Sequence, residues 1–190
     1  MNENVLIKAI SVLNEIAPSC GYPIYSSMDL RDSGWKCVCV DFNLFPAGFN
    51  NLDENSVEHA SLLMQSFLSS RLLKTSPWKL AIIPEAHTNN QGYLNNLLAL
   101  KLILEKANCE CKIVWPGPPI PKPWTLKTKT GEDIIYHPIE EVLQDVDAVL
   151  LNHDMSGGLN DVIKKFQVPV FPNPILSLIH ISEPTRLAWI

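Results

Sequence analysis

Residues 79–115 read KLAIIPEAHTNNQGYLNNLLALKLILEKANCECKIVW. This stretch consists of a short apolar run, a longer leucine-rich segment and a second apolar run. The run 79–83 (KLAII) lacks the polar alternation of a half-exposed strand, so it resembles a strand covered on both faces. Residues 93–107 carry apolar side chains at helical spacing, and the run 111–115 (CKIVW) returns to a strand pattern. This order predicts a β–α–β unit with parallel strands.

The same alternation of apolar runs and helical segments extends to both sides of this unit. The elements expected before it are a helix over 3–17, a strand over 36–40 (KCVCV) and a helix over 54–74 with Asp53 as its N-cap. Those expected after it are a hairpin over 125–138 with its turn near Thr130–Gly131, a short helix over 139–144, a strand over 147–151, a helix over 159–166 and a strand from 168 to 171. We therefore predict an α/β fold: an open, mostly parallel Rossmann-like sheet with helices on both faces and a small β-hairpin insertion.

Composition and charge narrow the range of partners. The chain has 190 residues, 46% of them hydrophobic, and its 15 Lys and Arg against 20 Asp and Glu give a net charge of −5. Without a basic cluster, a nucleic-acid partner is not expected. No apolar run approaches the roughly 20 residues that span a bilayer, and the N-terminus lacks a signal-peptide pattern. We expect a cytoplasmic protein that binds small molecules and neither nucleic acid nor membrane.

The five cysteines form two Cys-x-Cys pairs and one single residue, namely Cys20, Cys37, Cys39, Cys109 and Cys111. In a chain without a secretion signal we expect them to be reduced and mostly buried. The two pairs could in principle supply four thiolates to zinc, but ligand pairs are usually separated by two to four residues. Core packing is the simpler interpretation, and no metal site is predicted.

Polar residues follow three of the predicted strands. They are Asp41, Asn43, Asn50 and Asn51 after the first strand, Glu85, His87, Thr88 and Asn89 after the second, and Asn152, His153, Asp154 and Ser156 after the strand over 147–151. Because ligands bind beyond the carboxyl ends of parallel strands, these loops predict one polar crevice. Turn formation and helix capping would explain the same Asn and Asp residues. Phe45 and Phe49 are interpreted as a loop plug. There is no dinucleotide-binding, P-loop or nucleophile-elbow motif.

The loop sequences indicate a particular protein family, which the periodicity of the helices and strands cannot do. MDLRDSGWK at 28–36 and VDFNLFPAGFNNL at 40–52 resemble the N-terminal region of the proteobacterial type of glutamate-cysteine ligase (gamma-glutamylcysteine synthetase), whose patterns are close to D-x-R-x-x-G-x-K and V-D-x-N-L-F-P-x-G-F-N-N-L. IPEAHTN at 83–89 and LNHDMSGG at 151–158 are similar to two further loops of that family. The resemblance covers about residues 28–174.

This resemblance implies an ATP-dependent ligase that joins the γ-carboxyl of L-glutamate to L-cysteine, the first step of glutathione biosynthesis. The reaction would pass through an acyl phosphate, with Mg²⁺ offsetting charge on the nucleotide phosphates. It also implies a pre-ATP-grasp-like domain followed by a separate nucleotide domain. ATP and Mg²⁺ are then expected for the full-length enzyme, and neither is expected to be held by this chain alone, which should be inactive alone. Oligomeric state, and which loop meets which amino acid, stay open.

The resemblance also implies roles for particular residues. Arg31 would pair with an amino-acid carboxylate through its fork of donors, with Asp29 holding it in place. Asp41, Asn43, Asn50 and Asn51 would order the first loop and contact substrate, Glu85 would accept from a substrate ammonium, His87 and Thr88 would position neighbours, and Asn152, Asp154 and Ser156 would complete the same crevice. No catalytic residue is assigned.

Two boundaries and two other functions complete the sequence-based expectations. Residues 1–175 are expected to form an N-terminal α/β substrate-binding domain of a truncated enzyme. Residues 176–190, which include LSLIHISEPTR, look like a translated sequencing adapter and receive no role. The alternatives to a ligase are a non-catalytic amino-acid-binding α/β domain and a purely structural domain whose polar loops are helix caps.

Overall fold

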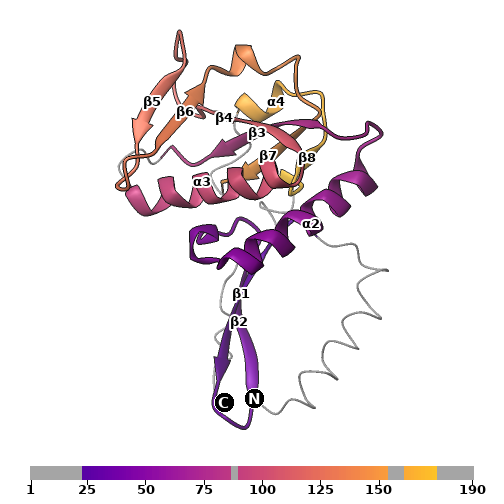
Figure 1. The fold of residues 1–190 in the computed structure, drawn as a ribbon, viewed down its shortest axis with the longest axis vertical. Coiled ribbons are helices and arrows are strands. Elements are labelled where there is room, and N and C mark those ends of the chain that lie inside the picture. The colour runs from indigo at the N-terminus through magenta and orange to yellow at the C-terminus, as the bar shows by residue number, and fades with distance from the viewer. Residues whose placement is uncertain (1–22, 87–89, 154–160, 175–190) are drawn as a thin grey trace, which may run out of the picture.

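The computed structural model describes residues 23–86, 90–153 and 161–174, which contain a six-stranded sheet, a separate two-stranded hairpin and helices on both faces of the sheet (Figure 1). The sheet strands are β3 (Trp78–Pro84), β4 (Cys109–Val114), β5 (Trp124–Lys127), β6 (Asp133–His137), β7 (Ala148–Asn152) and β8 (Val170–Phe171). The helices are α2 (Glu54–Arg71), α3 (Gln91–Lys106) and α4 (Asp161–Lys164), with single 3-10 turns η1 (Phe49–Asn51) and η2 (Ile139–Glu141).

The predicted α/β fold is confirmed. The strand order is β5-β6-β4-β3-β7-β8, and every neighbouring pair is parallel except β5 and β6, which form the expected hairpin. The predicted helix over 54–74 corresponds to α2, and its Asp53 cap accepts a hydrogen bond from the Ser56 amide at 2.7 Å. The predicted helix over 3–17 lies outside the described residues.

Alternate side chains of the central strands enter two different cores. Leu80 and Ile82 of β3 pack with α2 and α3 on one face, and Ala81 and Ile83 pack with η2 and α4 on the other. In Figure 1, α2 and α3 accordingly lie on one side of the sheet and α4 on the other. Such two-sided burial explains why the central strands read as continuous apolar runs.

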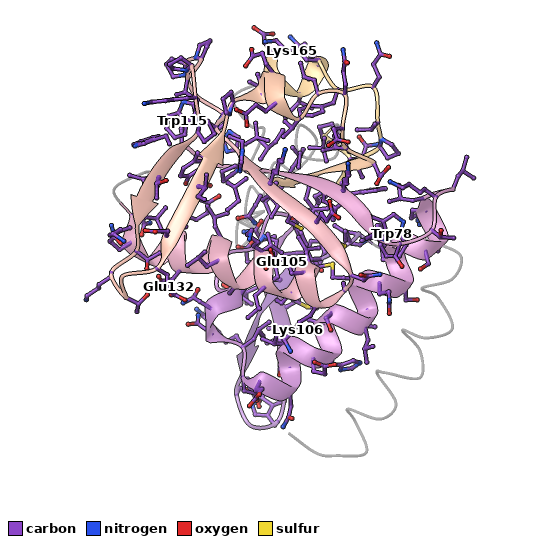
Figure 2. The ribbon with its side chains drawn as sticks, turned by 45° about the horizontal axis from the view of Figure 1, so that its top comes forward. Trp78, Glu105, Lys106, Trp115, Glu132 and Lys165 are labelled. Carbon is purple, nitrogen blue, oxygen red and sulfur yellow. The ribbon has the colours of Figure 1, made fainter. Side chains whose placement is uncertain are left out.

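The parallel strands share one direction, so their carboxyl ends meet at one edge. Trp78 begins β3 and Trp115 follows β4, and Figure 2 shows these two residues at opposite ends of the strands. The loops that carried the predicted polar residues after β3 and β7 leave from the carboxyl edge. A ligand-binding site is therefore expected at that edge.

The prediction that 36–40 forms a buried strand of the parallel sheet is wrong. These residues belong to β2 (Cys37–Asn43), which pairs antiparallel with β1 (Ser27–Asp32) in a hairpin that projects away from the sheet (Figure 1). Its turn is closed by Ser33 and Lys36, with Gly34 at a φ of 88° that a side chain would disfavour. Every residue of both strands is exposed. A short apolar run cannot by itself distinguish a strand in a core from one in a projecting hairpin.

The cysteine prediction is half right. The thiols of Cys37 and Cys39 are exposed in the hairpin, whereas Cys109 is buried and Cys111 partly buried in β4. All four are free thiols, and the two pairs lie in different sheets. Cys20 lies outside the described residues.

Candidate functional site

The loop between the hairpin and η1 crosses the carboxyl edge of the sheet. Phe45 packs against the core beside α4, and Phe49 packs against the core beside α3. Pro46, which lies between them in sequence, is buried. Phe49 also meets the Tyr25 ring edge to face at 5.5 Å. The two phenylalanines therefore plug both faces of the sheet, as the loop-plug interpretation expected, and fix the path of the NLFPAGFNN segment.

Two buried asparagines hold this loop on the sheet. Asn96 of α3 is 1% exposed, and its Oδ1 accepts hydrogen bonds from the Gly48 amide at 2.7 Å and the Phe49 amide at 3.0 Å. Its Nδ2 donates to Asn152 Oδ1 at 3.2 Å, and Asn152 Nδ2 donates to the Pro46 carbonyl at 2.8 Å. Each buried polar group thus finds a partner, which burial requires. Gly48 has a φ of 101°, which lets its amide point toward Asn96.

Two tyrosine hydroxyls extend this network across the strand ends. Tyr93 Oη donates to the Asn152 carbonyl at 2.8 Å and accepts from the Glu85 amide at 2.8 Å, so it joins β7 to the loop after β3. Tyr25 donates to the Leu151 carbonyl. Burial raises the pKa of both hydroxyls well above the ordinary value. Both therefore stay protonated and act as neutral hydrogen-bonding groups.

The hairpin brings four predicted site residues onto one face. In its register Asp29 lies opposite Asp41 and Ser27 lies opposite Asn43, and Arg31 is two residues from Asp29 on the same strand. Alternation along a strand places 27, 29 and 31 on the same face. Like charges directly opposite each other are unfavourable, so Asp29 and Asp41 favour a cation between or near them. This polar face consists of Ser27, Asp29, Arg31, Asp41 and Asn43, and the apolar Val38 lies opposite Arg31 on the same face.

The remaining predicted residues fall into three places. Glu85 and Asn152 lie at the carboxyl edge, where Asn152 is 3% exposed and its amide contacts protein groups. Asn50 lines a groove of about 500 Å³ beside α3 and the β5–β6 turn, and the Asn51 Oδ1 accepts from Asn50 Nδ2 at 3.4 Å. His87, Thr88, Asp154 and Ser156 lie outside the described residues. Substrate contact by any of these residues stays a prediction.

Comparison with known proteins assigns the family. The glutamate-cysteine ligase model (GshA) matches residues 13–179, which include the hairpin, the plug loop and the loops after β3 and β7. The chain belongs to this family. No curated protein matches the chain significantly.

A solved structure supports the same assignment for this ligase-family chain. It is a protein from Methylobacillus flagellatus KT described as a candidate gamma-glutamylcysteine synthetase, with a TM-score of 0.78 and 32% sequence identity. The match covers 89% of the present chain but 41% of the solved one. The ligase-family chain described here therefore spans about two fifths of the length of that relative.

Neither a metal site nor a membrane span is found in the described part of this ligase-family chain. There, no three His, Cys, Asp or Glu side chains gather closely enough to hold a metal ion. Over the same ranges, no helix is long and apolar enough to cross a membrane. We therefore assign no Mg²⁺ ligands among the described residues and derive no step through that ion.

Sequence reasoning missed Tyr25, Tyr93 and Asn96. Asn96 could have been found, because it lies on the apolar stripe of the helix pattern between Leu94 and Leu100, where an amide must be buried with partners. The hairpin also had a signal. Asp32-Ser33-Gly34 is a turn sequence, and the residues before it alternate between apolar and charged.

Proposed function

We propose that this chain is the amino-terminal, substrate-binding part of an ATP-dependent ligase that joins the γ-carboxyl of L-glutamate to L-cysteine, and that it works in the cytoplasm. The observation that carries the proposal is the family match over residues 13–179. Every described residue of the candidate site lies within this range. Glutathione biosynthesis would be the pathway that uses the product.

The hairpin's polar face has the chemistry to recognise a free amino acid. An amino-acid zwitterion carries one carboxylate and one ammonium group within a few bonds of each other. Arg31 supplies a forked donor for the carboxylate, and Asp29 and Asp41 supply acceptors for the ammonium. An ammonium beside the two aspartates would also relieve their mutual repulsion. Both charges of the ligand are therefore matched on one surface.

The proposed reaction has two steps. An oxygen of the glutamate γ-carboxylate attacks the terminal phosphorus of ATP, forming an acyl phosphate and releasing ADP. The cysteine amine then attacks the acyl carbon, phosphate leaves with the electron pair of the C–O bond, and the nitrogen loses a proton. In this scheme the present residues bind and orient an amino acid. The buried network of Asn96, Asn152 and Tyr93 holds the plug loop that directly follows the hairpin.

A segment exchange tests the proposal. Residues 13–179 would replace the aligned segment of the longer Methylobacillus flagellatus relative, and ATP-dependent formation of γ-glutamylcysteine would be measured in parent and chimera. We expect product from both. Within the chimera, Arg31→Ala should lower kcat/KM for one amino acid at least tenfold, roughly the loss of one charged hydrogen bond. Lys165→Ala, which removes an exposed cation outside the hairpin and its family pattern, serves as the control.

Two results would overturn the proposal. One is an active parent with a chimera that is folded, as judged by circular dichroism and gel filtration, but makes no product. The other is a folded parent and a folded chimera that both fail to make product when supplied with ATP, Mg²⁺, glutamate and cysteine.

A further inference from the structure

The face of the hairpin opposite its polar face is apolar and open to solvent. Met28 lies opposite Phe42, and Leu30 lies opposite Cys39, where the register shifts and Val40 is the extra residue of a bulge. Leu30 is 58% exposed and Val40 54% exposed. This apolar face consists of Met28, Leu30, Cys39, Val40 and Phe42, which are neighbours on two paired strands. It is larger than the exposed apolar pair of α2, Leu62 and Leu63.

Nothing in the described part of the chain pairs with the hairpin as a further strand. β1 and β2 form a sheet of their own, so the outer edge of each strand has no sheet partner there. A two-stranded hairpin alone is marginally stable in water, and exposed apolar patches mark interaction sites. A hairpin with one apolar and one polar face can bury its apolar face against another surface and leave its polar face exposed to solvent.

We propose that the apolar face docks against the part of the ligase that lies outside the aligned region in the longer solved relative. The hairpin lies inside the family match, so it belongs to the family's fold and is not peculiar to this chain. The solved relative has more than half of its residues outside the aligned region, which provides a second folded surface in the same molecule. Covalent linkage makes that surface the occupant with the highest effective concentration.

Docking in this way has a consequence for the site. The polar face, with Asp29, Arg31 and Asp41, would remain uncovered beside the junction between the two parts of the enzyme. Ligand pockets form preferentially at such junctions. The docking contact itself rests on family membership and not on the proposed reaction, so the two can fail separately.

Hydrogen exchange followed by mass spectrometry tests the contact in both proteins as they exist. In the 190-residue chain, the amides of residues 28–42 should exchange with little protection, since the hairpin opens without unfolding the sheet. In the longer relative, the aligned amides should exchange at least about tenfold more slowly. No nucleotide or amino acid is added, so the readout is independent of activity.

A pair of substitutions shows which face makes the contact. In the longer relative, Asp at the position aligned with Leu30 should remove the extra protection of the hairpin. Asp at the position aligned with Leu73, which is fully exposed after α2, should leave it unchanged. If the first variant fails to fold, Ala at the position aligned with Val40 replaces it, with partial loss of protection expected.

Three outcomes would overturn the proposal. Equal, weak protection in the two proteins would show that nothing docks on the hairpin. Strong protection in the 190-residue chain together with a dimer mass by light scattering would assign the face to a second copy of the chain. Strong protection in a monomeric 190-residue chain would assign it to a segment of the same chain.

Discussion

The carboxyl edge of the sheet and the β1–β2 hairpin both carry polar residues of the family pattern, yet they use them in different ways. At the edge, Asn96 and Asn152 are almost completely buried and bond to each other and to the plug loop. On the hairpin, Asp29 and Arg31 are exposed. A polar residue of the family pattern can thus hold the framework, as Asn152 does, or stay exposed, as Asp29 and Arg31 do, where we propose that it faces a ligand. Burial and partners separate the two roles.

Deleting an apolar side chain from each region should give the largest contrast. Leu80 of β3 is fully buried, so Leu80→Ala should lower the free energy of unfolding by about 3 to 4 kcal/mol through lost burial and a cavity. Leu30 of β1 is largely exposed, and Leu30→Ala should change the free energy of unfolding by less than about 0.5 kcal/mol. Urea denaturation followed by circular dichroism measures both. Similar losses in the two variants would mean that the hairpin is part of the folding core.

Removing one amide from the edge network should have the next largest effect. Asn96→Ala leaves the Gly48 and Phe49 amides and the Asn152 Oδ1 without their partner, which should cost about 2 to 3 kcal/mol. Asn95 is only partly buried, and its Oδ1 has no hydrogen-bond partner among the described residues. Asn95→Ala is therefore the matched control and should stay within about 0.5 kcal/mol of the wild type. A mild Asn96→Ala variant would show that the loop does not depend on this network.

The smallest effect concerns alkaline pH. Burial raises the pKa of the Cys109 thiol from 9.0 to about 12. The unfolded chain therefore loses this proton at lower pH than the folded chain does. The stabilisation that Cys109 contributes is complete below pH 9 and is lost as pH rises from 9 toward 12.

The pH dependence can be isolated by substitution. At pH 10 the wild type should have lost about 1 kcal/mol of stability through Cys109, relative to pH 8. Cys109→Ala should show a correspondingly smaller decrease between the same two pH values, whatever its stability at pH 8. Urea midpoints at pH 8, 9 and 10 measure the decrease, and parallel curves for the two proteins would remove this thiol from the explanation.

The sequence predicted the sheet better than the contacts of the candidate site. Strands are marked by local apolar runs, whereas those contacts join residues that are far apart in the chain. The apolar runs at 79–83 and 147–151 report burial directly, and the structure pairs them as neighbouring parallel strands. The run at 36–40 has a similar composition, but within the described residues it pairs with β1 alone, and the turn sequence at 32–34 is the local signal for that pairing. Asn152 meets the Pro46 carbonyl across 106 residues, and such a partner cannot be read from the residues near either position.

The most direct test of the proposed ligand-facing role of the hairpin is isothermal titration of the 190-residue chain with L-glutamate and with L-cysteine. Arg31→Ala and Lys165→Ala would be titrated beside the wild type. We expect saturable binding of at least one amino acid, weakened by about 1.5 to 3 kcal/mol in Arg31→Ala and unchanged in Lys165→Ala. No binding by the wild type, or equal affinity in Arg31→Ala, would contradict it.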